Sequence, residues 1–181
     1  MKATGIVRRI DDLGRIVIPK EIRRTMRIRE ADPLEIFTNH EGEIILKKYS
    51  PIGELGEFAK EYADSLAQVT GHVVCITDRD QIIAVAGAAK KDYMGKSIST
   101  QLDKTINNRS FVLAERADKK FVMIIDGDDE VTSEVISPII CEGDAIGAVI
   151  IFGKEQGRKM GEVEQKLATS AAGFLGKQME S

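Results

Sequence analysis

The most informative segment of this 181-residue chain is Asp12-Leu-Gly-Arg-Ile-Val-Ile-Pro-Lys-Glu-Ile-Arg-Arg24. Residues 15–18 are rich in β-branched side chains and predict a short strand. Pro19 ends that strand, because it cannot donate to a ladder, and it suits the first turn of a helix. A helix is therefore expected over residues 20–27. Before the strand, Gly14 is free to take the positive φ of a tight turn.

Further strands are expected on both sides of this segment. Residues 5–10 alternate imperfectly between apolar and polar side chains, and residues 34–38 and 43–48 flank a turn as in a hairpin. A block of this length buries little apolar surface, and domains below about 60 residues are marginal on their own. The block is therefore expected to form an obligate homodimer in which two chains share one core.

Charge is distributed unevenly along the chain. Residues 1–50 carry 11 Lys or Arg against 8 Asp or Glu, whereas the remainder carries 15 against 21. Residues 1–30 are more basic still, with 9 against 4. A basic head on an acidic body indicates an anionic partner for the head. Nucleic acid is the first candidate and a membrane surface is the second.

Residues 1–50 resemble the AbrB-type transition-state regulator domain. The resemblance is carried by the gapless segment 12–24, by the residues before it, and by Ile28-Arg-Glu-Ala-Asp-Pro-Leu-Glu-Ile-Phe37. It implies a swapped-hairpin β-barrel dimer that binds double-stranded DNA. The remainder, through Met160-Gly-Glu-Val-Glu164 and Ala171-Ala-Gly-Phe-Leu175, resembles the GAF-like body of sporulation regulators from spore-forming bacteria. That resemblance implies a transcription regulator, both activator and repressor, of late genes in the forespore.

Four arginines lie on three different elements of the predicted head, and a dimer doubles them to eight: Arg8, Arg15, Arg23 and Arg24. Guanidinium groups bind phosphates bidentately and can read guanine edges. The resemblance places these positions on the family's DNA-facing surface; the alternative is that they only cover a solvated face. Weaker candidates are Lys2, Arg9, Lys20 and Arg27. Since no recognition helix is present, we expect phosphate contacts, a few base contacts and shape readout.

Residues 51–55 are expected to be a linker that leads into a helix over residues 53–69, and a second helix is expected over residues 160–179. The first helix has an apolar seam with heptad-like spacing, at Leu55, Ala59, Tyr62, Leu66 and Val69. This seam is typical either of a contact between copies or of a helix packed on its own domain. Helices at both ends of the domain 56–181 predict a second contact between copies, which would build a homotetramer.

Between these helices the sequence predicts a sheet and a further helix from residue 99 or 100 to residue 108. Strands are expected at residues 73–77, 82–86, 121–125, 135–141 and 145–152. Antiparallel strands with flanking helices form an α+β sandwich, as in GAF and PAS sensors. A pocket is expected between the sheet and the loops 87–93 and 127–132. The cyclic-nucleotide signature of some GAF domains is absent, so the body is expected either to sense an unidentified small molecule or to be purely structural.

Several classes of protein are disfavoured by the sequence. No catalytic set, metal-ligand spacing or cofactor motif is found, so neither an enzyme nor a cofactor is expected. Cys75 and Cys141 lack CxxC spacing and are expected to be buried strand residues. The absence of a signal peptide or an apolar segment of membrane-spanning length predicts a cytoplasmic protein. An antitoxin is the alternative, because that class shares the swapped-hairpin head, but residues 53–181 do not resemble an antitoxin's disordered tail.

Overall fold

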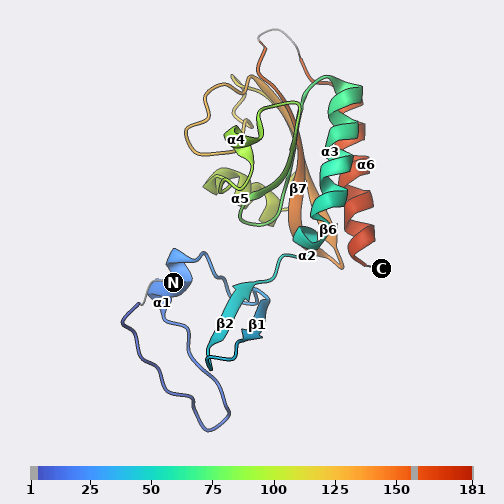
Figure 1. Cartoon of the computed structure of the whole chain (residues 1–181). Coiled ribbons are helices and arrows are strands. Elements are labelled where there is room, and N and C mark those ends of the chain that lie inside the picture. The colour runs from blue at the N-terminus through green and yellow to red at the C-terminus, as the bar shows by residue number, and fades with distance from the viewer. Residues whose placement is uncertain (1–3, 156–158, 181) are drawn as a thin grey trace. The chain divides into compact units, whose positions relative to one another are not determined.

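The computed structural model describes residues 4–155 and 159–180, and the chain divides into two compact units, Met1–Tyr49 and Ser50–Ser181. Figure 1 shows both, coloured along the chain. They are called the N-terminal unit and the C-terminal unit below. The secondary structure mixes helices with antiparallel strands in an α+β arrangement.

The N-terminal unit contains one short helix and one hairpin. Helix α1 (Lys20–Thr25) follows Pro19, whose ring suits a helix start. Strands β1 (Leu34–Thr38) and β2 (Ile44–Lys48) pair antiparallel from Leu34 opposite Lys48 to Thr38 opposite Ile44. The Asn39 side chain accepts hydrogen bonds from the backbone N–H groups of Glu41 and Glu43, which closes the turn between the strands.

The strands predicted at residues 5–10 and 15–18 do not form. Within the described range, residues 4–18 are an extended loop around one tight turn, as Figure 1 shows in dark blue. A strand needs a neighbour to bond its backbone groups, and no strand among residues 4–155 and 159–180 pairs with these segments. The side chains of Val7 and Val17 are 86% and 72% exposed.

Apolar side chains elsewhere in this unit are exposed as well. Pro19 is the one buried residue among residues 4–49. The exposed large apolar side chains among residues 4–49 are Ile6, Val7, Ile10, Leu13, Ile16, Val17, Met26, Ile36, Phe37, Ile44, Leu46 and Tyr49. A single copy of the N-terminal unit therefore has no core of its own.

The C-terminal unit begins with two helices, α2 (Pro51–Glu54) and α3 (Gly56–Thr70). The residues predicted as a linker are thus mostly helical. Ser50 caps α2, because its hydroxyl accepts a hydrogen bond from the Gly53 N–H at 3.2 Å, and Pro51 occupies the first helical position. Ile52 is fully buried, so this short helix belongs to the packed body.

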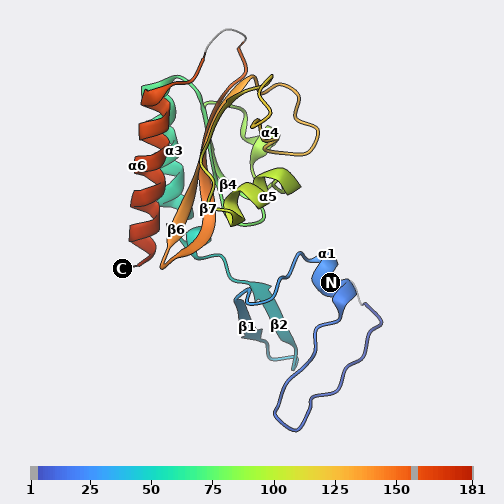
Figure 2. The same ribbon diagram turned by 180° about the vertical axis from the view of Figure 1, so that it is seen from behind.

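A five-stranded antiparallel sheet lies at the centre of the C-terminal unit, in the order β4-β3-β7-β6-β5. Its strands are β3 (Val73–Thr77), β4 (Ile82–Ala86), β5 (Val112–Glu115), β6 (Ser133–Cys141) and β7 (Asp144–Gly153). Figures 1 and 2 show α3 and α6 (Glu162–Met179) side by side on one face. The other face carries α4 (Lys90–Tyr93) and α5 (Thr100–Asn107). Ser99 caps α5 by accepting from the Leu102 N–H, as the sequence predicts.

Helix α6 lies very close to β6. A Cβ atom added to Gly176 would stand 2.0 Å from the carbonyl oxygen of Ile140, so only glycine allows this approach. Ala168, Ala171, Ala172 and Leu175 fill the same buried side of the helix. The small side chains let the helix cover the sheet at short range, and the sheet's fully buried isoleucines complete the core.

Three further details of this unit differ from the predictions. Residues 121–125 are not a strand, although Val122 and Ile124 are buried. The Val122 N–H donates to the side-chain carboxyl group of Glu134 at 2.6 Å instead of to a neighbouring strand. Strand β5, which the sequence analysis does not predict, takes the edge of the sheet. Cys75 is buried in β3, as predicted, whereas Cys141 is only partly buried.

Candidate nucleic-acid interface

The predicted DNA-binding residues come from three segments of the N-terminal unit. Arg8 and Arg9 lie in the loop before the turn, Arg15 follows the turn, and Arg23 and Arg24 lie in the last turn of α1. All five are exposed, as is Lys20 at the start of α1. Lys2 lies outside the described residues.

Most of these cationic side chains have no partner in the described part of the chain. The side chains of Arg8, Arg9, Lys20, Arg23 and Arg24 form no hydrogen bond or ion pair with any residue of 4–155 or 159–180. Their donors are therefore available to an anion. Each guanidinium offers five N–H donors in a fixed planar geometry, which matches the oxygens of a phosphate.

Arg15 differs from the other arginines because a carboxylate holds it. Its Nε donates to Asp11 Oδ2 at 2.8 Å, and the Asp11 Oδ1 accepts from the backbone N–H groups of Leu13 and Arg15. The hydrogen bond from the Arg15 backbone, followed by that from its guanidinium, lowers the pKa of Asp11. The turn and the arginine head group are thus organised by one carboxylate.

The sequence predicts only a turn at Asp11 and does not indicate its contact with Arg15. An Asp and an Arg four positions apart are readily identified as a pair on a helix. Outside a helix this spacing carries no such signal. The turn itself is indicated by the segment Asp11-Asp12-Leu13-Gly14, because aspartate and glycine are common turn residues.

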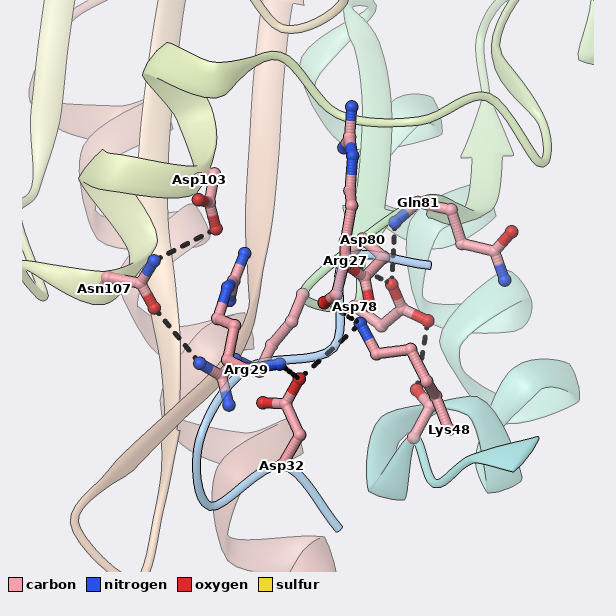
Figure 3. Close-up of polar contacts among 11 residues, drawn as sticks. Arg27, Arg29, Asp32, Lys48, Asp78, Asp80, Gln81, Asp103 and Asn107 are labelled. Atoms are coloured by element: carbon pink, nitrogen blue, oxygen red, sulfur yellow. Dashed lines mark hydrogen bonds and ion pairs between the residues drawn. The ribbon is translucent and has the colours of Figure 1, made fainter. Parts of the chain in front are cut away.

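Arg27 has a different surrounding from the arginines above. Its carbonyl accepts a hydrogen bond from Lys48 Nζ at 2.8 Å, and Lys48 also approaches Asp32 Oδ2 at 3.7 Å. Asp32 Oδ2 accepts from the Arg29 backbone N–H at 2.8 Å (Figure 3). These contacts fasten the loop between α1 and β1 onto β2, which is a structural role.

Within the C-terminal unit, Figure 3 also shows how Asp78 closes the turn between β3 and β4. Its Oδ1 accepts from the backbone N–H groups of Asp80 and Gln81, both at 2.7 Å. Its Oδ2 accepts from the Ser50 hydroxyl at 3.1 Å. This buried carboxylate therefore ties the start of the unit to the edge of the sheet.

The C-terminal unit has a cavity of about 210 Å³ at one end of the sheet. Its described lining residues are Gly71, His72, Val73, Gly87, Phe152, Gly153, Lys154 and Glu155. The predicted loop 87–93 contributes Gly87, whereas no described lining residue belongs to 127–132. His72 is buried, and its Nε2 stands 4.0 Å from Glu164 Oε1.

The described residues include no group of three or more His, Cys, Asp or Glu side chains that could hold a metal ion. Nor does any helix among them have the length and apolar character needed to cross a membrane.

Comparison with known proteins gives consistent matches for both units. Residues 54–180 match the family described as "Stage V sporulation protein T C-terminal, transcription factor", and residues 7–54 match "Antidote-toxin recognition MazE, bacterial antitoxin". Stage V sporulation protein T of Bacillus subtilis (strain 168) is 62% identical over 99% of both chains. Transition state regulatory protein AbrB of the same strain is 41% identical over 60% of this chain and 93% of its own.

Solved structures that resemble this chain over its C-terminal part include GAF domains and a chemotaxis protein. The GAF domain of an Acinetobacter phosphoenolpyruvate-protein phosphotransferase aligns with a TM-score of 0.59, at 14% identity, over 71% of this chain and 87% of its own. A methyl-accepting chemotaxis protein fragment aligns with a TM-score of 0.58, at 19% identity, over 70% and 93%. At such identities these structures show a GAF-like fold for the C-terminal unit and nothing about its ligand.

Proposed function

The chain belongs to the stage V sporulation protein T family, and we propose that it regulates sporulation genes by binding double-stranded DNA with paired N-terminal units. An AbrB-like domain precedes a GAF-like domain, as the sequence predicts. The family is described as a transcription factor, and no catalytic role is proposed.

One observation supports the DNA-binding surface above all others. Cationic side chains from the loop before the turn and from α1 are exposed and have no partner among the described residues: Arg8, Arg9, Lys20, Arg23 and Arg24. Exposed cations without partners can neutralise the phosphates of a polyanion. The counterions that those phosphates release then favour binding. We assign phosphate and base contacts to Arg8, Arg15, Arg23 and Arg24, and supporting phosphate contacts to Lys2, Arg9 and Lys20.

The proposal includes a homodimer formed by the N-terminal units. Twelve large apolar side chains among residues 4–49 are exposed in one copy, including Val7, Val17 and Ile36. So many exposed apolar side chains on one small unit indicate an interaction site. Residues 5–10 and 15–18, which have no strand neighbour within one copy, would pair with a second copy and bury these side chains.

A second contact between copies, which would build a tetramer, is proposed for helices α3 and α6. Phe174 stacks on Phe58 and on Tyr62, with ring centroids 5.6 and 5.5 Å apart. Phe58 and Phe174 are both exposed, and so are Val69 and Val163 at the opposite ends of the two helices. Exposed aromatic and aliphatic side chains along two neighbouring helices are typical of a helix-to-helix interface.

The cavity at the end of the sheet is the proposed site for a small-molecule effector of unidentified class. It combines the apolar side chains of Val73 and Phe152 with the charged groups of Lys154 and Glu155. A ligand that binds there would raise the melting temperature of the chain. If no member of a broad metabolite panel raises it, the C-terminal unit serves only assembly.

The proposed place of action follows from the partner. A regulator of transcription acts where the chromosome is, which is the cytoplasm, and for late sporulation genes the forespore. Fluorescence microscopy of a tagged chain during sporulation checks this, and an even distribution between the forespore and the mother cell would contradict the forespore assignment.

The experiment that tests the function is the salt dependence of DNA binding by the full chain. If about six to eight phosphates are neutralised, a plot of log affinity against log salt has a slope of about −5 to −7. A variant with Arg8, Arg15, Arg23 and Arg24 all changed to alanine should give a shallower slope. A wild-type slope near zero contradicts electrostatic docking on DNA.

An antitoxin remains the second candidate, because residues 7–54 match an antitoxin family. Residues 50–181 argue against it, since they form a packed GAF-like unit rather than a segment that folds around a toxin. Purification of the tagged chain from its native host distinguishes the two: recovery of a small toxin in a fixed ratio supports the antitoxin, and its absence supports the regulator.

A further inference from the structure

We infer that Asp11 is a positioning residue for DNA recognition: it holds the Arg15 guanidinium by one edge and leaves the other edge facing outward for a base. This inference rests on the DNA-binding function proposed above. Asp11 is negatively charged, whereas the other residues assigned to this DNA-binding surface are cations.

The geometry of the turn gives Asp11 two tasks. Its Oδ1 accepts the backbone N–H groups of Leu13 at 3.0 Å and of Arg15 at 2.8 Å, while its Oδ2 accepts the Arg15 Nε–H at 2.8 Å. The main chain closes the same turn, because Asp11 N–H donates to the Arg15 carbonyl and Gly14 N–H donates to the Asp11 carbonyl, both at 3.0 Å. One oxygen thus shapes the backbone, and the other fixes the side chain.

The contact with Asp11 uses only the Nε donor of Arg15. No other hydrogen bond or ion pair of this guanidinium exists within residues 4–155 and 159–180, so both Nη groups keep their N–H donors for another partner. The Arg15 side chain is 67% exposed. Two parallel N–H donors on a held guanidinium are what the O6 and N7 atoms of a guanine accept.

Holding the side chain in advance favours base reading. A long flexible side chain loses rotamer freedom when it binds, and a side chain that is already fixed loses less. Arg8, Arg9, Arg23 and Arg24 have no such partner among the described residues. Arg15 is therefore the arginine best prepared to contact one base pair, while the others can follow phosphates on any sequence.

The charge of Asp11 leads to the same conclusion. A carboxylate close to a duplex repels every phosphate regardless of sequence, so it lowers non-specific affinity. Two roles of Asp11 offset this cost: its Oδ1 closes the turn, and its Oδ2 orients the Arg15 guanidinium. Asp11 thus lowers the non-specific affinity for DNA and increases the discrimination between sequences.

The test compares D11N with D12N in the full chain. The amide introduced by D11N keeps an oxygen for the two backbone N–H groups but presents an NH₂ group, which cannot accept from Arg15 Nε. Asp12 is the matched control, because it is exposed in the same turn and has no side-chain contact among the described residues. Both variants remove one negative charge.

Affinity is measured for a duplex selected by the wild-type chain from a random pool and for a random duplex at the same salt concentration. D11N is expected to bind the selected duplex about 3- to 10-fold more weakly, a part of the discrimination that one bidentate arginine gives. Its affinity for the random duplex should stay equal or rise. D12N should bind both duplexes at least as well as the wild-type chain.

Combining D11N with R15A isolates the positioning role. In the R15A background D11N should no longer weaken binding to the selected duplex. The Arg15 Nε–H resonance in an NMR spectrum gives a readout that does not need DNA: slow exchange with water is expected in the wild-type chain and in D12N, and fast exchange in D11N.

The outcomes separate this inference from the proposed function. If the wild-type chain binds neither duplex, both are overturned. If it binds but D11N and D12N behave alike, or D11N weakens binding equally in the R15A background, only the positioning role is overturned. Loss of binding by D11N with an unchanged Arg15 Nε–H resonance also contradicts it.

Discussion

The arginines of the N-terminal unit can be tested one at a time, because their side chains support little of the fold. Changing Arg8, Arg23 or Arg24 to alanine removes no contact among the described residues. Each change should weaken DNA binding by about 1–3 kcal/mol where the side chain reads a base, and by less where it meets only phosphate. Titration by fluorescence anisotropy measures this, with unchanged circular dichroism as the check on folding.

Lys60→Ala is the matched control for these variants. Lys60 is exposed on α3, has no side-chain contact in the described part of the chain, and carries the same charge. It should leave the affinity unchanged. If the three arginine variants also bind as tightly as the wild-type chain, the assigned surface is wrong.

Glu134 predicts an unusual dependence of stability on pH. Its side chain is 0% exposed, and burial raises its pKa to about 8, against the smaller opposing effects of the Val122 N–H and of Arg116. The unfolded carboxyl loses its proton near its ordinary pKa of about 4.3, whereas the folded one keeps it up to about pH 8. The contribution of Glu134 to stability is therefore fully present below about pH 4 and is lost as the pH rises toward 8.

Glu134→Gln removes this dependence, because glutamine stays neutral and can still accept from the Val122 N–H. The variant should exceed the wild-type chain in free energy of unfolding by about 2–4 kcal/mol near pH 7.5, from 1.36 kcal/mol for each unit of pKa shift. The difference should vanish near pH 4. Urea titrations across this range measure it, and a constant difference between the two proteins would contradict the burial effect.

At the scale of elements, the close approach of α6 to β6 depends on a single glycine. Gly176→Ala places a methyl group 2.0 Å from the Ile140 carbonyl oxygen, so the helix must move away from the sheet. We expect a loss of about 1–3 kcal/mol in the free energy of unfolding, as for other overpacked cores. Chemical denaturation measures the change.

The control for this variant lies in the same helix. A Cβ atom on Gly173 meets nothing within 4 Å, so Gly173→Ala should stabilise the chain by about 0.5–1 kcal/mol through helix propensity alone. Destabilisation of equal size by both variants would show that the close contact with β6 is not the reason why residue 176 must be glycine.

Elements whose partners lie close in sequence were predictable. Strands β3 and β4 stand where two apolar, β-branched runs flank a turn, and α5 begins at the Ser99 cap that the sequence indicates. Residues 121–125 show the limit of such patterns. The alternation of apolar and polar side chains predicts that Val122 and Ile124 are buried. It does not predict that the Val122 backbone N–H donates to the side chain of Glu134 on β6.

The candidate site was predictable to a similar extent. Charge, spacing and the family resemblance together predict the arginines, and their assignment to DNA stays a prediction. These signals do not identify Asp11, whose role depends on a turn that brings its carboxylate to Arg15. The strands expected at residues 5–10 and 15–18 lack a partner within one copy, so neither the sequence nor a single chain shows how they pair.

At the scale of the whole molecule, assembly should depend on the aromatic cluster of α3 and α6. Phe174→Glu places a charge between Phe58 and Tyr62 and should reduce the assembly to N-terminal dimers. Thr169→Glu, at an exposed position on another side of α6, should leave it unchanged. Sedimentation equilibrium measures the mass, and an unchanged mass for Phe174→Glu would remove the cluster from the interface.

The pairing of two N-terminal units around DNA is the claim on which the proposed function depends. An experimental structure of the full chain bound to a duplex tests it most directly. Residues 5–10 and 15–18 should then form strands with a second copy, and Arg8, Arg15, Arg23 and Arg24 of both copies should face the duplex. An N-terminal unit that binds DNA as a single copy, or arginines turned away from the duplex, would contradict the account.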